Sequence, residues 1–341
     1  MSLELILAGT ILIALTFYVL FGGADYGAGV WSLLAGGPRA LAQREAIAKA
    51  IGPIWEANHV WLILVVTILF TSFPKAFALI STRLHIPLSL MLIGIVLRGS
   101  AFAFRTNDVV PRTVSEARAQ KFWERIFAVS SVFTPIMLGM AIGAVASGRM
   151  TEHGGAFMDT FVRPWATPFC FTVGLLALAL FAFLAAVYLV LEAQDDALRE
   201  DFRRRALWAG GVAVLLAGAV FLLSNSAAPH VRYQLSHTIW GTMTLAIAGF
   251  SALAALTSLW RRMYRMAFVC TVSEVIFIVW GWGVAQYPYL VVPAVTIADS
   301  APIQTLQLVL VTVVIGALLL FPSLYYLYRI FKGGTIRRAL E

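Results

Sequence analysis

Long apolar stretches separated by short polar connections dominate the chain. Nine of them hold about 20 residues with few charges, the length that an α-helix needs to cross a bilayer. They lie near residues 3–24, 51–73, 77–101, 123–147, 165–191, 207–224, 236–259, 264–286 and 304–328. The pattern predicts an all-α polytopic membrane protein with about nine transmembrane helices.

Composition supports this prediction. Hydrophobic residues make up 60% of the 341 residues and charged residues only 12%, whereas soluble domains carry roughly 25% charged residues. So few charges cannot cover a water-exposed surface, which excludes a soluble globular domain. The formal charge of +8 is carried by arginines in the short connections, so it indicates membrane orientation rather than nucleic-acid binding.

The basic residues predict the orientation. When successive connections are assigned alternately to two sides, one side holds 19 lysines and arginines and the other holds 5, with Arg98 near the first side. Positive connections stay in the cytoplasm. The N-terminus is therefore expected outside and the C-terminus in the cytoplasm, and the alternation itself supports the count of nine.

The same alternation suggests a division of the chain. Stretches one to four and five to eight run in the same sense across the membrane. We expect a first four-helix unit at 1–147, a second at 148–290, and the ninth helix with a cytoplasmic tail at 291–341.

Ionisable residues cluster in three of the stretches. Asp25, Glu56, His59 and Arg98 are expected at a similar depth near the cytoplasmic face. A charge at the bilayer centre costs about 2.5–3.5 kcal/mol on insertion scales. Such groups are retained where they pair or carry function, and Glu56 and His59, three residues apart, share a helix face.

Neighbouring residues complete this candidate cluster. Trp55 and Asn58 belong to the same segment as Glu56, and Gly23 and Gly27 form a small-xxx-small pair that lets another helix approach closely beside Asp25. Two hypotheses follow. The cluster is either a hydrated path for protons or substrate that enters from the cytoplasm, or a set of salt bridges at the membrane edge.

Glu274 is a separate buried-acid candidate near the middle of the eighth stretch. An ionised carboxylate there needs a partner, and otherwise it is protonated and hydrogen-bonded. Its position leaves functional and structural roles equally open.

The chain itself has no recognisable metal or cofactor motif. Cys170 and Cys270 lie within apolar runs, where a thiol behaves as a small hydrophobe. His85 and His237 are lone histidines, no span has paired histidines at bundle spacing, and no Cys-x-x-Cys-His occurs. We therefore expect neither metal nor haem binding by this chain alone, and no catalytic residue on it.

Several segments resemble the signature sequences of one family. They are GGADYGAG at 22–29, WEANHVW at 55–61, RGSAFAFR at 98–105, GWGVAQYPY at 281–289, and Thr296-Ile followed by APIQTL at 301–306. In order and in register, they are similar to subunit II of cytochrome bd-type quinol oxidases. The resemblance covers nearly the whole chain.

This resemblance implies a fold, an activity and partners. The fold is two four-helix bundles plus one peripheral helix. The haem-free subunit pairs with a similar subunit I, which holds b-type and d-type haems, in a bacterial inner-membrane complex that reduces O2 to water with electrons from quinol. It leaves room for a small single-helix accessory subunit and, as in some members, a structural quinone.

The resemblance also suggests roles for two carboxylates. Asp25 matches the Asp of the glycine-rich motif and Glu56 stands at the family's acidic position after Trp55, so either could relay protons. Ala103 replaces a Glu found in many members, so a role for that carboxylate is lost or moved. The Glu-Ala-Asn-His version of the motif resembles the cyanide-insensitive branch.

Two other functions fit the residues. A secondary transporter or ion antiporter would also use a buried carboxylate cluster, and it would be favoured by broken helices at corresponding positions of the two halves. The third possibility is a purely structural subunit.

Overall fold

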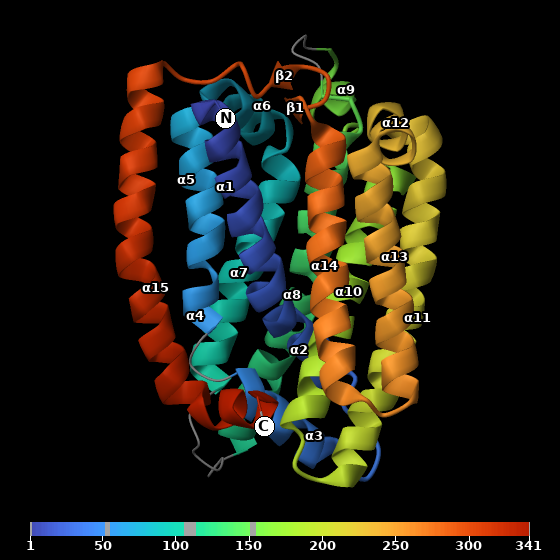
Figure 1. The fold of residues 1–341 in the computed structure, drawn as a ribbon. Helices are drawn as coiled ribbons and strands as arrows, with labels where there is room; N and C mark the ends of the chain where they lie inside the picture. The colour runs from blue at the N-terminus through green and yellow to red at the C-terminus, as the bar shows by residue number, and fades with distance from the viewer. Residues whose placement is uncertain (1, 52–54, 106–113, 151–154, 341) are drawn as a thin grey trace.

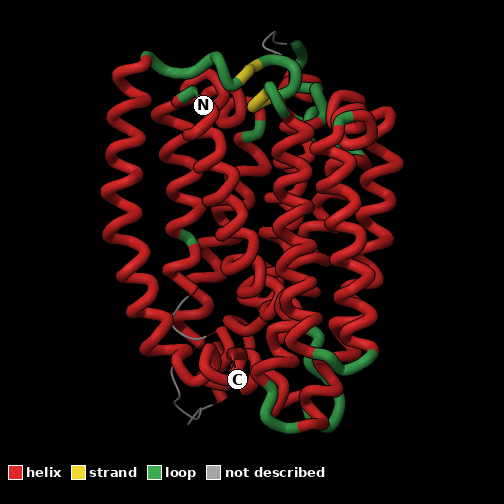
Figure 2. Tube along the Cα trace, viewed as in Figure 1, coloured by secondary structure: helices red, strands yellow, loops and turns green. Residues whose placement is uncertain are grey.

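The computed structural model describes residues 2–51, 55–105, 114–150 and 155–340 of the chain. Within these ranges, the side chains of 51, 55, 56, 105, 114–117, 328 and 331–340 lie outside the description. Nearly the whole described chain is helical, and the helices run between two ends of the molecule (Figure 2). The N-terminus lies at one end and the C-terminus at the other (Figure 1).

Candidate membrane crossings make up most of the described chain. In the described part, eight helices are long and apolar enough to span a membrane, and the ninth candidate, α5, passes the same test only together with α6, from which it is bent by 117°. The crossings are α1 (Leu3–Phe17) with η1 (Tyr18–Gly22) and α2 (Gly23–Leu33), α4 (Trp55–Asn58) with α5 (Val60–Ser72), α7 (His85–Arg105), α8 (Val114–Ala146), α10 (Pro168–Glu192), α11 (Asp196–Ala227), α13 (Ile239–Trp260), α14 (Tyr264–Gln286) and α15 (Ile303–Leu340). The predicted all-α polytopic fold class is confirmed.

The first crossing is longer than the predicted 3–24. It continues through the π-helical turn η1 into α2 and ends at Leu33. The glycine-rich segment is therefore helical, because its glycines lie against neighbouring helices rather than in a turn. A Cβ built on Gly27 would lie 1.9 Å from the carbonyl oxygen of Phe181 on α10.

The third crossing begins later than the predicted residue 77. α5 ends at Ser72, and α6 (Pro74–Arg83) leaves it at a bend of 117°. The bend follows from Pro74, because proline excludes the α region for the residue before it, and Phe73 has φ −132° and ψ 60°. The crossing helix α7 starts at His85, so the segment before it is a separate surface helix.

Short elements close the two ends of the bundle. At the N-terminal end lie α9 (Phe157–Phe161), α12 (Pro229–His237) and the antiparallel pair β1 (Tyr289–Val291) and β2 (Val295–Thr296). At the opposite end lies α3 (Ala40–Ile51), visible in Figure 1.

Burial separates a central helix from a peripheral one. α10 has the largest buried share of the spans, 72% of its most apolar window, and packs against α2, α8, α11 and α14. The corresponding window of α15 is 0% buried, and this helix lies at the edge of the molecule in Figure 1. The division into units at 1–147 and 148–290 stays a prediction.

Candidate functional site

Asp25 and Asn58 form the centre of the predicted polar cluster. The Nδ2 group of Asn58 on α4 donates a hydrogen bond of 2.5 Å to Oδ2 of Asp25 on α2. Asn58 is buried, at 5% exposure. In Figure 1 both helices lie in the half of the bundle nearer the C-terminus. The structure thus brings two of the predicted residues, 33 positions apart, into direct contact.

His59 lies between two tyrosines. It follows Asn58 and caps the start of α5. The centroid of its ring lies 6.0 Å from that of Tyr18 and 6.4 Å from that of Tyr26. These tyrosines were not among the predicted site residues, yet they are 0% and 1% exposed and connect His59 to the remaining member of the cluster.

Arg98 on α7 completes the cluster. Its side chain is 2% exposed, and its guanidinium carbon lies 4.6 Å from the centroid of the Tyr26 ring and 5.2 Å from that of Phe127. Stacking of this kind is favourable, particularly where the cation is desolvated. The ion pairs present within the described residues do not include Arg98.

Small residues allow these helices to approach. A Cβ on Gly29 of α2 would lie 2.1 Å from Oγ of Ser131 on α8, and a Cβ on Gly94 of α7 would lie 2.2 Å from Oγ1 of Thr134. Trp31 on α2 donates from Nε1 to the carbonyl of Ala182 on α10 at 2.7 Å. Close backbone contact therefore holds α2 and α7 at the depth of the cluster.

The contacts described above do not include the three other predicted residues, Trp55, Glu56 and Glu274. The side chains of Trp55 and Glu56 lie outside the described residues, although both belong to α4. Glu274 lies on α14 and is 4% exposed, and within the described chain its Oε2 atom has no hydrogen-bond partner. The next residue, Val275, packs with Ala14 and Leu15 of α1, so Glu274 lies where α14 packs against the first crossing.

The two lone histidines of the sequence analysis lie at exposed positions. No group of three or more His, Cys, Asp and Glu side chains in the described part of the chain could hold a metal ion. His85 and His237 are exposed, with Nδ1 2.9 Å from the Thr82 carbonyl oxygen and 3.3 Å from the Tyr233 carbonyl oxygen.

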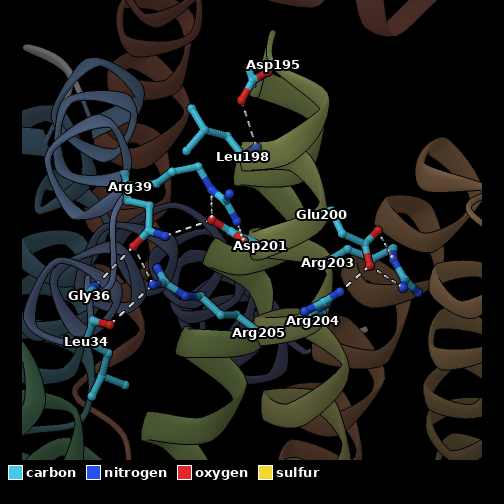
Figure 3. A network of polar contacts seen from close by, with 11 residues as sticks. Leu34, Gly36, Arg39, Asp195, Leu198, Glu200, Asp201, Arg203, Arg204 and Arg205 are labelled. Carbon is cyan, nitrogen blue, oxygen red and sulfur yellow. Dashed lines mark hydrogen bonds and ion pairs between the residues drawn. The ribbon is translucent and has the colours of Figure 1, made fainter.

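A second polar network joins the helices at the C-terminal end (Figure 3). Arg39 forms an ion pair with Asp201 on α11 at 2.6 Å, and Gln43 donates to the same carboxylate at 2.8 Å. Arg205 donates to Oε1 of Gln43 at 2.6 Å. Within α11, Glu200, which precedes Asp201, pairs with Arg203 at 2.7 Å. The contacts of Asp201 and Arg205 with Arg39 and Gln43 fasten the start of α3 to α11 and lie at the end where the basic residues gather.

Comparison with known proteins decides the family. The family model described as cytochrome bd terminal oxidase subunit II matches residues 3–331. The chain belongs to this family. It is therefore one subunit of an oxidase complex, and the name subunit II implies that a separate subunit I is its partner.

Individual relatives agree with this assignment. The chain is similar to a protein of Bacillus subtilis (strain 168) assigned as cytochrome bd menaquinol oxidase subunit II, at 22% identity over 92% of this chain and 91% of the relative. Cytochrome bd-I ubiquinol oxidase subunit 2 of Escherichia coli (strain K12) is 24% identical over 54% of this chain and 46% of its own length.

A solved structure shows the same fold. A chain of the bd oxidase from Geobacillus thermodenitrificans superposes with a TM-score of 0.75 at 23% identity, covering 97% of this chain and 99% of that one. The subunit therefore shares the all-α membrane fold of that chain. The transporter alternative finds no support in these relatives.

Proposed function

We propose that this subunit II supports a haem-bearing subunit I and carries part of a proton uptake path from the cytoplasmic side. The partner would hold the b-type and d-type haems and transfer electrons from quinol to O2. The relatives are named for menaquinol in one case and ubiquinol in another. We therefore propose a quinol as the electron donor without choosing between these two headgroups.

One observation carries the proton-path proposal. The hydrogen bond joins the carboxylate of Asp25 to Asn58, the residue before His59. The ring of Tyr26 lies between His59 and the guanidinium of Arg98. Carboxylates and histidines inside membrane helices commonly form proton relays. Glu56 and Trp55 are assigned to the same path from their place in the sequence next to Asn58 and His59.

The orientation is part of the proposal. The cluster lies in the half of the bundle nearer the C-terminus, the end where 19 of the 25 basic residues are expected. With that end in the cytoplasm, the N-terminus outside and the protein in a bacterial inner membrane, protons would enter the path from the cytoplasm. A structural quinone and a single-helix accessory subunit remain components to be sought by mass spectrometry of the purified complex.

The test is a conservative replacement in the whole oxidase. Asp25→Asn keeps the size of the side chain but cannot hold a transferable proton, so quinol oxidation should slow at least tenfold while the reduced-minus-oxidised haem spectrum stays unchanged. Glu56→Gln should behave in the same way. Asp196→Asn, an acid with 93% side-chain exposure at the same end of the bundle, is the matched control and should retain full turnover.

The outcomes separate the hypotheses. Normal turnover of both Asp25→Asn and Glu56→Gln would reject the relay. Loss of the haem signal together with activity would instead assign the cluster to holding the helices in place.

A further inference from the structure

Three arginines converge on one carboxylate where α11 begins and α13 ends. Arg203 binds both oxygens of Glu200, at 2.8 and 2.7 Å, and also donates to the carbonyl of Leu259 on α13 at 3.3 Å. Arg204 lies 3.3 Å from Oε1 of Glu200, and Arg262, just after α13, lies 3.6 Å from Oε2. Figure 3 shows the two α11 arginines around Glu200. Three positive charges against one negative charge leave a formal excess of two.

Two of these arginines carry the excess charge at the surface. The side chain of Arg203 is 13% exposed and satisfies Glu200 through a bidentate pair, the strong geometry for these groups. The side chains of Arg204 and Arg262 are 72% and 67% exposed. A guanidinium carries five N–H donors, so one contact with Glu200 leaves both groups able to bind a further anion.

Neighbouring acids on α11 have cations of their own. Asp196 pairs with Arg199 at 2.7 Å, and Asp201 pairs with Arg39 at 2.6 Å. These carboxylates therefore leave the excess charge around Glu200 in place.

Arg262 is held in a backbone conformation that favours glycine, with φ at 61°. Its amide donates to the carbonyl of Leu259 at 3.2 Å, and the amide of Met263 donates to that of Ser258 at 2.8 Å. This pair of bonds forms a Schellman helix end, in which the position of Arg262 is usually glycine. The left-handed region is unfavourable for a residue with a Cβ. The helix end alone therefore does not explain an arginine here, which points to a use for its side chain.

Two tryptophans mark the depth of these arginines. Trp208 lies one turn after Arg204 on α11, and Trp260 is the last residue of α13; they are 78% and 73% exposed. Exposed tryptophans gather where the hydrocarbon core of a bilayer meets the headgroups. Arg204 and Arg262 therefore lie at the level of the lipid phosphates.

The face of α11 that carries Trp208 is apolar farther along the helix. Leu215 and Leu222 continue it at seven-residue intervals and are exposed. Gly211 and Gly218 lie between them, and a Cβ added at either would meet nothing within 4 Å. Bulky side chains thus alternate with glycines along this face, which leaves shallow recesses beside the bulky residues for an acyl chain.

We propose that an anionic phospholipid binds between α11 and α13, with its phosphate on Arg204 and Arg262 and an acyl chain along the Trp208 face. A phosphodiester supplies the negative charge that the arginines lack, and guanidinium groups match the geometry of phosphate oxygens. Basic pockets between membrane helices at this depth bind anionic headgroups. The apolar face favours lipid phosphate over free phosphate. The site is separate from the Asp25–Asn58 pair, so it does not rest on the proposed function.

Native mass spectrometry of the intact oxidase tests this preference. The purified complex is offered phosphatidylglycerol or phosphatidylcholine with identical acyl chains. The wild type should retain phosphatidylglycerol, and the double variant Arg204→Gln/Arg262→Gln should retain it about tenfold less, because basic residues near the headgroups attract anionic lipid. Arg44→Gln, at an exposed position of α3, is the matched control and should retain as much as the wild type. Equal retention of both lipids by the wild type, or undiminished retention by the double variant, would overturn the site.

A glycine variant separates binding from folding. Arg262→Gly removes the guanidinium and suits the φ of 61°. In detergent without added lipid, its complex should unfold at the wild-type temperature or above, yet gain less than the wild type when phosphatidylglycerol is added. A lower unfolding temperature without lipid, with an unchanged gain on lipid addition, would show that Arg262 only holds the helix end and would overturn the proposal.

Photocrosslinking in native membranes identifies the occupant. With benzoylphenylalanine in place of Leu215, subunit II should acquire the mass of a phospholipid. Crosslinking to another polypeptide instead would show that a protein covers this face. Displacement of retained phosphatidylglycerol by inorganic phosphate would show a site for free anions. Either result would overturn the proposal.

Discussion

Glycine positions show how single residues position this site. Gly27 on α2 lies so close to α10 that an added Cβ would be 1.9 Å from the Phe181 carbonyl oxygen and 2.7 Å from the Cβ of Ala185. The neighbouring atoms include backbone, which cannot rotate away. The close helix approach predicted from the Gly23 and Gly27 pair is confirmed, and it fixes the depth at which Asp25 lies.

Gly27→Ala is therefore expected to destabilise the subunit. Overpacking of a core costs about 1–3 kcal/mol, which should lower the thermal unfolding temperature of the purified complex by several degrees. Gly9→Ala is the matched control in the same crossing, because an added Cβ there meets nothing within 4 Å; it should match or slightly exceed the wild type. Equal unfolding temperatures for the two variants would contradict the packing argument.

At the scale of elements, breaks in the helices position the polar groups. The π turn aligns Tyr18 with Tyr26, and the break at Phe73 turns α6 across the N-terminal end. There Lys75 at the start of α6 reaches Asp299, which follows β2, at 2.9 Å. Asp299 also accepts bonds from the amide and hydroxyl of Thr296, at 3.0 and 2.8 Å. One carboxylate thus joins α6 to the connection between α14 and α15.

This carboxylate gives a pH-dependent contact. The Thr296 amide, followed by the Lys75 ammonium, lowers the pKa of Asp299 to about 2 from its ordinary value of 3.8. A lowered folded-state pKa means that the contribution is fully present above about pH 4 and is lost as the pH falls toward 2. Because the pair is partly exposed, the contribution is about 0.5–1 kcal/mol.

Asp299→Ala should consequently loosen the hairpin at neutral pH. Hydrogen exchange of a peptide covering 289–301, corrected for the intrinsic rate, should be about two- to fivefold faster than in the wild type at pH 7. The difference should shrink as the pH falls from 4 toward 2. A difference that is constant across this range would show that the ionised carboxylate is not its source.

At the scale of the whole molecule, the charge distribution predicts how the bundle lies in the membrane. The end with α3 and the start of α11 holds the network of Arg39, Asp201 and Arg205 (Figure 3). The opposite end holds the hairpin and the N-terminus (Figure 1). The positive-inside rule predicts that the first end is cytoplasmic.

Single-cysteine labelling checks this orientation. In a Cys270→Ser background that retains the buried Cys170, Ser2→Cys should react with a membrane-impermeant maleimide in intact cells. Asp196→Cys, at a position with 93% side-chain exposure, should react only after permeabilisation. The reverse pattern would show that the C-terminus lies outside.

The sequence by itself determined the class of the fold, because apolar runs of spanning length have no other stable solution in a bilayer. It also predicted that Asp25, Glu56, His59 and Arg98 lie at a similar depth, since buried polar groups are costly wherever they occur. Only the tertiary structure decided their partners. The contact of Asp25 with Asn58 and the placing of Arg98 over Tyr26 depend on how α2, α4 and α7 pack. Tyr18 and Tyr26 escaped prediction because an eight-residue spacing separates them on a regular helix, and the inserted π residue that aligns them leaves no mark in the hydrophobic pattern.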